Sequence, residues 1–142
     1  MTYAARRPTG SYSVKSYSYI GLETQVMSAT PERLITLLYA GARAAIAQAR
    51  LHLEAGRIVE RGQAIGKAIR IVDEGLKLGL NQDAGGEVAA NLARLYDYIT
   101  RKLLTANLKA DKEQLDIADR LLADLSEAWQ ASVDHPAPAV PA

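Results

Sequence analysis

The sequence contains no cysteine and no phenylalanine, and it has only two histidines, His52 and His135. The absence of cysteine excludes disulfides and thiol chemistry. No carboxylate stands three or four residues before His52, so the Glu-x-x-His pattern of di-iron bundles is missing, and no zinc-spaced cluster can be assembled. The phosphate-binding motif GxxxxGK[ST] does not occur. We therefore expect no metal, no cofactor and no catalytic residue.

The sequence also lacks a large net charge and long apolar runs. The formal net charge of the 142 residues is +1, whereas nucleic-acid binders normally carry a strong basic excess. No apolar run approaches the roughly 18 residues of a membrane span, and the first residues, MTYAARRPTGSYS, lack the apolar core of a signal peptide. These features predict a cytoplasmic protein that neither binds nucleic acid nor inserts into a membrane.

Proline is nearly absent from the interior, because only Pro31 lies between residues 9 and 135. The strongest helix breaker is thus missing from a long stretch, and no segment alternates with the period of a strand. The sequence predicts an all-α fold, an antiparallel four-helix bundle with a short additional N-terminal helix around residues 17–25. We expect a flexible arm at residues 1–15, a bundle domain at 16–133 and a disordered tail at 134–142.

Helix boundaries are marked by capping residues. Thr30 is an expected N-cap, with Pro31 at the first helical position, and this helix should end near Gly56. The second helix is expected at about 58–78, before Gly79. The stretch NQDAGG, residues 81–86, reads as a loop, and the third helix should span about 87–106. Asp111 should cap the last helix, with Gln114 in the capping-box position.

The last three helices each carry one apolar stripe at helical spacing. In the second helix the stripe comprises Ile58, Ile65, Ile69, Val72 and Leu76. In the third it comprises Val88, Leu92, Leu95, Ile99 and Leu103. In the fourth it comprises Leu115, Ala118, Leu122, Leu125 and Trp129. We expect these three stripes to form the core of the bundle together with the first helix.

The helix at 31–55 differs because it carries two apolar stripes. The first comprises Leu34, Leu38, Ala42, Ala45, Ala49 and Leu53. The second comprises Leu37, Ala40, Ala44, Ala47 and Leu51. A four-helix bundle buries one face of each helix, so the second stripe needs another cover. The short N-terminal helix could supply it, alanine could serve there only as a helix former, or the stripe could be a groove for a partner helix or the seam of a homodimer.

Tyrosines are concentrated near the N-terminus. Four of the seven fall in the first nineteen residues: Tyr3, Tyr12, Tyr17 and Tyr19. A disordered arm is usually poor in aromatic residues. Apart from chance enrichment, the pattern indicates an arm that docks, either on a groove of its own chain or on another chain.

Four stretches together carry a more specific signal: SYSYIGLETQVMSATPERLITLLYAGA, AIRIVDEGLKLGL, NLARLYDYITRKLLTANLKAD and LADLSEAWQ. In this order, over about residues 16–131, the chain resembles the FliS family of flagellin-specific export chaperones. The resemblance implies a cytoplasmic helical bundle that binds the C-terminal helical segment of newly made flagellin. It also implies delivery to the flagellar type III export gate. The family usually has an asparagine where this chain has Ala110. A general adaptor for amphipathic helices stays open as an alternative.

The resemblance also implies which residues contact the client. Those matching the first-helix motif, with their neighbour on the second stripe, are Leu37, Tyr39, Ala40 and Ala44. Those matching the third-helix motif are Tyr96, Tyr98, Arg101, Leu104, Asn107 and Leu108. Tyr17 and Ile20 match the N-terminal segment that covers the groove in the absence of client. Tyr96 also falls on the core-facing arc of its helix, so a purely structural role is equally compatible with its position.

Overall fold

The computed structural model describes residues 30–80 and 82–135, and every regular element within these ranges is a helix. In chain order they are α4 (Pro31–Glu54), α5 (Ile58–Arg70), the π-helical segment η1 (Ile71–Lys77), α6 (Gln82–Lys109) and α7 (Lys112–Asp134). The expected arm, the expected helix around residues 17–25 with Tyr17 and Ile20, and the tail beyond residue 135 lie outside the described residues.

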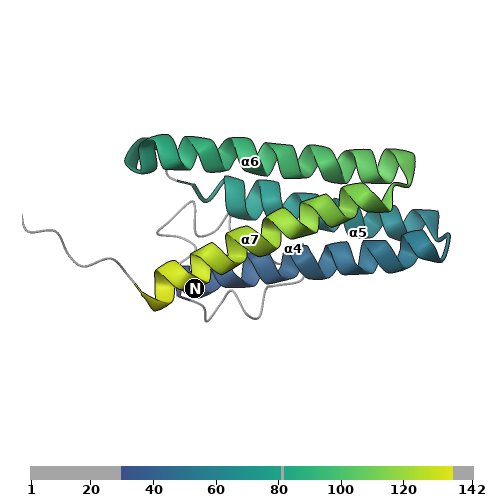
Figure 1. Cartoon of the computed structure of the whole chain (residues 1–142), viewed down its shortest axis with the longest axis horizontal. Helices are drawn as coiled ribbons and strands as arrows, with labels where there is room; N and C mark the ends of the chain where they lie inside the picture. The colour runs from purple at the N-terminus through teal and green to yellow at the C-terminus, as the bar shows by residue number, and fades with distance from the viewer. Residues whose placement is uncertain (1–29, 81, 136–142) are drawn as a thin grey trace, which may run out of the picture.

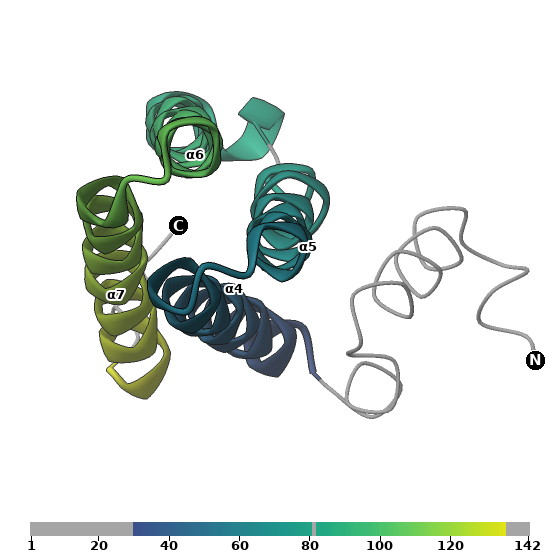
Figure 2. The same ribbon diagram turned by 90° about the vertical axis from the view of Figure 1, so that its right-hand side faces the viewer.

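The four helices lie side by side along one axis (Figure 1), and a view along that axis places them at the corners of a square (Figure 2). α4 packs against α5, η1 and α7, and α6 packs against the same three elements. α4 and α6 therefore occupy opposite corners. The prediction of an all-α helical bundle is confirmed.

Both ends of α4 are formed by the residues that the sequence marks. The backbone N–H of Arg33 donates to Thr30 Oγ1 at 3.1 Å, and Pro31 occupies the first helical position. At the other end Gly56 takes a φ of 73°, a left-handed conformation that glycine adopts without steric cost. The chain then reverses within three residues, which brings α5 back along α4.

The second helix covers the expected span, but its last part, η1, is π-helical, which was not expected. The backbone N–H of Leu78 donates to the carbonyl of Asp73, five residues earlier, at 3.1 Å. A π turn contains one more residue than an α turn, so two neighbouring pairs of residues can face the interior together. Those pairs are Ile71 with Val72 and Gly75 with Leu76, all buried. A purely 3.6-residue pattern therefore missed Ile71.

Gly75 allows η1 to approach α4 closely. A Cβ atom at this position would lie 2.8 Å from Leu38 Cδ2, which is closer than carbon atoms can pack. At the other end of the same stripe, Ile58 is 66% exposed, so its assignment to the core was wrong. Ile58 is the first residue of α5, and Val59 beside it is also exposed.

α6 is longer than expected at both ends. Residues 82–85, predicted to be loop, are helical, and the backbone bends at Gly86, where φ is 58° and ψ is −129°. Val88 follows directly after this bend and is 68% exposed, so its assignment to the core was also wrong. The helix continues past Asn107 to Lys109 and ends at Ala110, which has a φ of 50°.

α7 begins where the sequence predicted, but its capping box is not closed. The carboxylate of Asp111 accepts from the backbone N–H of Glu113 at 3.0 Å, which confirms the N-cap. The side-chain oxygen of Gln114 is buried without a hydrogen-bond partner in the described part of the chain. The Gln114 side chain therefore does not make the reciprocal contact expected from its position.

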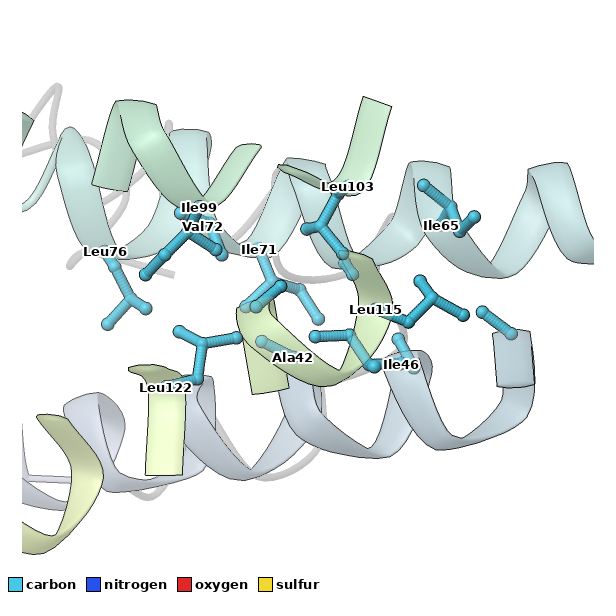
Figure 3. Packing of buried hydrophobic residues seen from close by; sticks show 14 of the residues in the cluster. Ala42, Ile46, Ile65, Ile71, Val72, Leu76, Ile99, Leu103, Leu115 and Leu122 are labelled. Carbon is cyan, nitrogen blue, oxygen red and sulfur yellow. The ribbon is translucent and has the colours of Figure 1, made fainter. Parts of the chain in front are cut away.

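The core runs along the bundle axis and is almost wholly aliphatic (Figure 3). Its largest fully buried side chains are Leu38, Ile46, Ile65, Ile71, Val72, Ile99, Leu103, Leu115 and Leu122. The first stripe of α4 belongs to it, because Leu38, Ala42, Ala45 and Ala49 are buried and Leu34 and Leu53 pack against it. The small residues of α4 permit close helix contacts on this side.

Candidate binding surfaces

The second apolar stripe of α4 faces outward. Leu37 is half-buried, Ala40, Ala44 and Ala47 are exposed, and Leu51 is 54% exposed. No element of residues 30–80 or 82–135 covers these side chains. We call these five residues the α4 face. It is apolar along its whole length, and its alanines leave the backbone accessible to a closely packed partner.

The α4 edge facing α7 has the opposite character. Arg43 donates to both carboxylate oxygens of Asp119 on α7 at 2.9 and 3.2 Å. Arg50 pairs with Asp116, also on α7. The hydrogen bond to Asp119 raises the pKa of Arg43 above its ordinary value. Further along, the indole N–H of Trp129 donates to Thr36 Oγ1 at 3.2 Å. These contacts fix α7 along one edge of α4, and within residues 30–80 and 82–135 no ion pair joins α4 to α5.

Tyr39 and Tyr96, both predicted to contact the client, lie inside the bundle. They are 4% and 3% exposed, and their hydroxyl oxygens are 2.6 Å apart. Burial raises the pKa of both hydroxyls. The pair joins α4 to α6 across the core, which satisfies two hydroxyl groups that would otherwise be buried unpaired. We therefore leave both tyrosines out of the proposed contact surfaces.

A second surface lies on α6. Tyr98 is 38% exposed, Leu104 58% and Leu108 83%, and Arg101 is also exposed. The Arg101 guanidinium lies 5.9 Å from the centre of the Tyr98 ring and the Lys102 ammonium 5.1 Å from it, within range of cation–π attraction. We call Tyr98, Arg101, Leu104 and Leu108 the α6 face.

Asn107, also predicted to contact the client, tethers two helices instead. Its side-chain oxygen accepts from Arg61 Nε at 3.0 Å, and its backbone carbonyl accepts from Arg61 Nη2 at 3.0 Å. The pairing fixes the start of α5 against the end of α6. Asn107 is half-buried in this arrangement, and Arg61 engages both its side-chain oxygen and its backbone carbonyl.

The predicted contact residues thus form two surfaces rather than one. Leu37, Ala40 and Ala44 gather on α4, whereas Tyr98, Arg101, Leu104 and Leu108 gather on α6. Figure 2 shows these helices at opposite corners, separated by α5 and α7. A partner that contacts both surfaces must therefore extend around the bundle.

Sequence reasoning missed Ile58 and Val59 as surface residues. They are 66% and 68% exposed, and they lie within one turn of Arg61, whose guanidinium reaches Asn107 at the end of α6. Ile58 and Val59 are the first two residues of α5, and this position at the helix end was the available signal.

The described residues contain neither a metal-ligand cluster nor a membrane-spanning helix. Within them no group of three or more His, Cys, Asp or Glu side chains could hold a metal ion. None of the helices in this part of the chain combines the length and the apolar character that crossing a membrane requires.

Comparison with known proteins identifies the family of this chain. The model of a family described as flagellar protein FliS matches residues 13–136, which is most of the chain. The chain belongs to the FliS family. The resemblance inferred from the four sequence stretches is thereby confirmed.

Three FliS relatives illustrate the likeness. The flagellar secretion chaperone FliS of Salmonella typhimurium is 48% identical over 117 residues, covering 82% of this chain and 87% of the relative. FliSB of Pseudomonas aeruginosa is 42% identical, covering 82% and 92%. FliS of Escherichia coli is 34% identical, covering 86% and 90%. All three are named flagellar secretion chaperones, so the family is one of secretion chaperones.

Proposed function

We propose that this protein is a flagellar type III export chaperone that binds the C-terminal helical segment of flagellin in the cytoplasm. It holds the segment unpolymerised and aids its delivery to the export gate. The observation that carries the proposal is the α4 face, an apolar stripe that no described element covers. Membership of the FliS family supports the same conclusion. The protein acts by binding rather than by catalysis.

The dimensions of the α4 face suit a helix. Leu37 and Leu51 are fourteen residues apart, which at 1.5 Å per residue is about 21 Å, or roughly four turns. An amphipathic segment can place its apolar side chains on such a stripe at positions i, i+3, i+4 and i+7. A segment that is unfolded beforehand orders as it binds, and the ordering cost is subtracted from the gain of apolar burial.

The α6 face provides the second contact of the same client. Because it lies at the opposite corner, a flagellin segment with more than one helical stretch can occupy both faces by passing around α5 or α7. Wrapping covers more of the client than a single groove would. Covering its assembly-competent residues explains how a small chaperone prevents premature polymerisation.

The test is a calorimetric titration of the full chain with the last helical segment of flagellin from the same organism. An unrelated amphipathic helix of equal length and hydrophobicity serves as the control. We expect one-to-one binding of the flagellin segment alone. Equal binding of both peptides would instead indicate a general adaptor for amphipathic helices. Binding of neither peptide would contradict the proposal that flagellin is the client.

A homodimer joined through the α4 face is the second candidate, because a stripe of exposed alanines between two leucines could pack against its own copy. Light scattering of the free chain distinguishes the two. A concentration-independent monomer supports the chaperone, whereas a stable dimer that an Ala44→Glu substitution dissociates would assign the α4 face to self-association.

A further inference from the structure

The outer surface of α6 carries basic residues in a regular arrangement. Arg94 and Arg101 are seven residues apart, and so are Lys102 and Lys109. A spacing of seven is close to two full turns, so each pair lies along one line of the helix, with its members about 10 Å apart. At about 100° per residue, Tyr98 falls between the two lines. We call the four basic residues and Tyr98 the basic face of α6.

These cations have no acidic partner in the described part of the chain. The four ion pairs recorded there use Arg43, Arg50, Lys77 and Lys112 as their basic members. By contrast, Arg101 and Lys102 lie against the Tyr98 ring, and Arg94 donates to the side chain of its neighbour Asn91. None of the four ion pairs uses a cation of the basic face, where Arg94, Arg101 and Lys109 are exposed and Lys102 is half-buried.

Apolar side chains border one of the two lines. On the helical projection Leu108 and Leu104 follow next to Arg101, and both are more than half exposed. Asp97 projects between the two leucines, but its carboxylate is paired with Lys77 of η1 at 2.7 Å. The surface therefore offers a hydrophobic edge beside an array of positive charges. This combination matches an amphipathic helix that has leucine-like residues on one side and carboxylates on the neighbouring side.

We infer that the basic face of α6 binds an acidic amphipathic helix, and that this helix is the part of the flagellar client lying on α6. The inference rests on the proposed function and adds the charge of the segment. Carboxylates seven residues apart on the client meet Arg94 with Arg101, or Lys102 with Lys109. The α4 face, which carries no charge, takes an uncharged apolar stripe of the same client.

The charges of α7 argue against an extended anionic surface as the occupant. α7 exposes Glu113, Asp124, Glu127 and Asp134, and its axis lies about 8–10 Å from that of α6. Over such a distance, comparable to the Debye length, like charges still repel. A nucleic-acid duplex or an anionic bilayer laid on α6 would also cover this acidic surface. A single narrow helix along α6 avoids it.

A second copy of the chain is also a poor occupant. Its acidic helix would be α7, but the large apolar side chains of α7 are buried or half-buried in the core. Each of the large hydrophobic side chains exposed in the described residues belongs to another segment. α7 of a second copy could thus offer carboxylates but no leucine for Leu104 and Leu108.

The direct test uses two synthetic helical peptides with the same apolar stripe. One carries glutamate at positions i and i+7 beside the stripe, and the other carries lysine there. Fluorescence anisotropy with the full chain should show binding of the glutamate peptide only, weakening as the salt concentration is raised. Equal binding of both peptides, or no effect of salt, would overturn the inference.

Charge reversal locates the site. Arg101→Glu should weaken binding of the glutamate peptide about three- to tenfold. Lys67→Glu, an equal change of charge at an exposed position of α5, should leave it unchanged. Equal loss in both variants would show a general charge effect and contradict the site. Binding of anionic vesicles that only Arg101→Glu abolishes, without peptide binding, would assign the face to membranes instead.

The same two variants separate this inference from the proposed function. If the flagellin segment binds the unmodified chain but binds Arg101→Glu and Lys67→Glu equally well, the basic face is not a client contact and the chaperone proposal stands. If the flagellin segment does not bind the unmodified chain at all, the proposed function is contradicted, and the inference that rests on it is contradicted as well. We expect selective weakening by Arg101→Glu.

Discussion

The outer faces of α4 and α6 lie at opposite corners of one bundle, yet they differ in chemistry. The α4 face is a stripe of alanines between Leu37 and Leu51, whereas the outer surface of α6 sets two leucines beside cations that form no ion pair within the described residues. The first can attract a partner only through apolar burial and close fit. The second adds charge, which favours specificity and fast encounter more than affinity. For one client, the α4 face can therefore supply affinity through apolar burial, and α6 can supply specificity through charge.

The largest expected effect comes from placing a charge on the α4 face. Ala44→Glu should lower affinity for the flagellin segment about 10- to 100-fold, because a carboxylate would be desolvated without a partner. Ala44 is exposed, so the helix content by circular dichroism should not change. Calorimetric titration measures the loss.

Ala131→Glu is the matched control for that substitution, since Ala131 is an exposed alanine on α7. Its affinity for the segment should equal that of the unmodified chain. Equal weakening by both substitutions would show that the α4 face has no special part in binding, and the contrast with α6 would lose its basis.

Substitutions of Tyr39 and Tyr96 test whether this pair stabilises the core or contacts the client. Tyr96→Phe leaves the Tyr39 hydroxyl buried without its partner, and should destabilise the fold by about 1–3 kcal/mol. The double substitution Tyr39→Phe with Tyr96→Phe removes both hydroxyls and should recover much of that loss. Urea denaturation measures both. Client affinity that falls in the double variant while stability is recovered would return the pair to the contact surface.

Ala110 tests a departure from the family pattern. Its φ of 50° lies in the left-handed region, where asparagine is tolerated better than alanine. Ala110→Asn should therefore stabilise the chain by about 0.5–1 kcal/mol, seen as a higher denaturation midpoint with the same slope. Because the substitution lies beyond the end of α6, client affinity should stay constant. A lower midpoint would contradict the backbone conformation assigned to this residue.

The smallest expected effect is a difference in how the two faces respond to salt concentration when they bind the flagellin segment. With Arg101→Glu, binding of the flagellin segment should depend on salt less steeply than in the unmodified chain, because a screened attraction has been removed. With Ala44→Glu the dependence contributed by α6 should persist. Titrations at several salt concentrations give both slopes. Identical slopes in the two variants would indicate that α6 contributes no electrostatic attraction.

Much of the fold could be predicted because its signals are local. Thr30 and Asp111 mark helix starts through side chains that accept from nearby backbone N–H groups, and Gly56 marks a helix end through its positive φ. Ile71 and Val88 were misassigned because their exposure depends on a π turn and on a bend at Gly86. Neither feature follows from a 3.6-residue period.

The candidate site was predictable as a set of residues but not as a shape. The two-stripe pattern of α4 correctly indicated that Ala40, Ala44 and Leu51 would remain outside the bundle core. A motif, however, does not distinguish a tyrosine that contacts a partner from one that pairs across the core, and Tyr39 shows this. The separation into two faces depends on the order of helices around the bundle, which only the packed structure provides.

One client is expected to occupy the α4 face and the α6 face at once. Because the sequence has no cysteine, single cysteines give unique positions for a photo-crosslinker. We choose Ala44 on the α4 face, Thr105, the half-buried neighbour of Leu104 on α6, and Ala131 on α7. After irradiation with the flagellin segment, mass spectrometry should locate crosslinks from Ala44→Cys and Thr105→Cys in two different stretches of flagellin. The second of these stretches should contain acidic residues, and Ala131→Cys should give no crosslink. Crosslinks from only one corner, or from both to the same stretch, would contradict the claim.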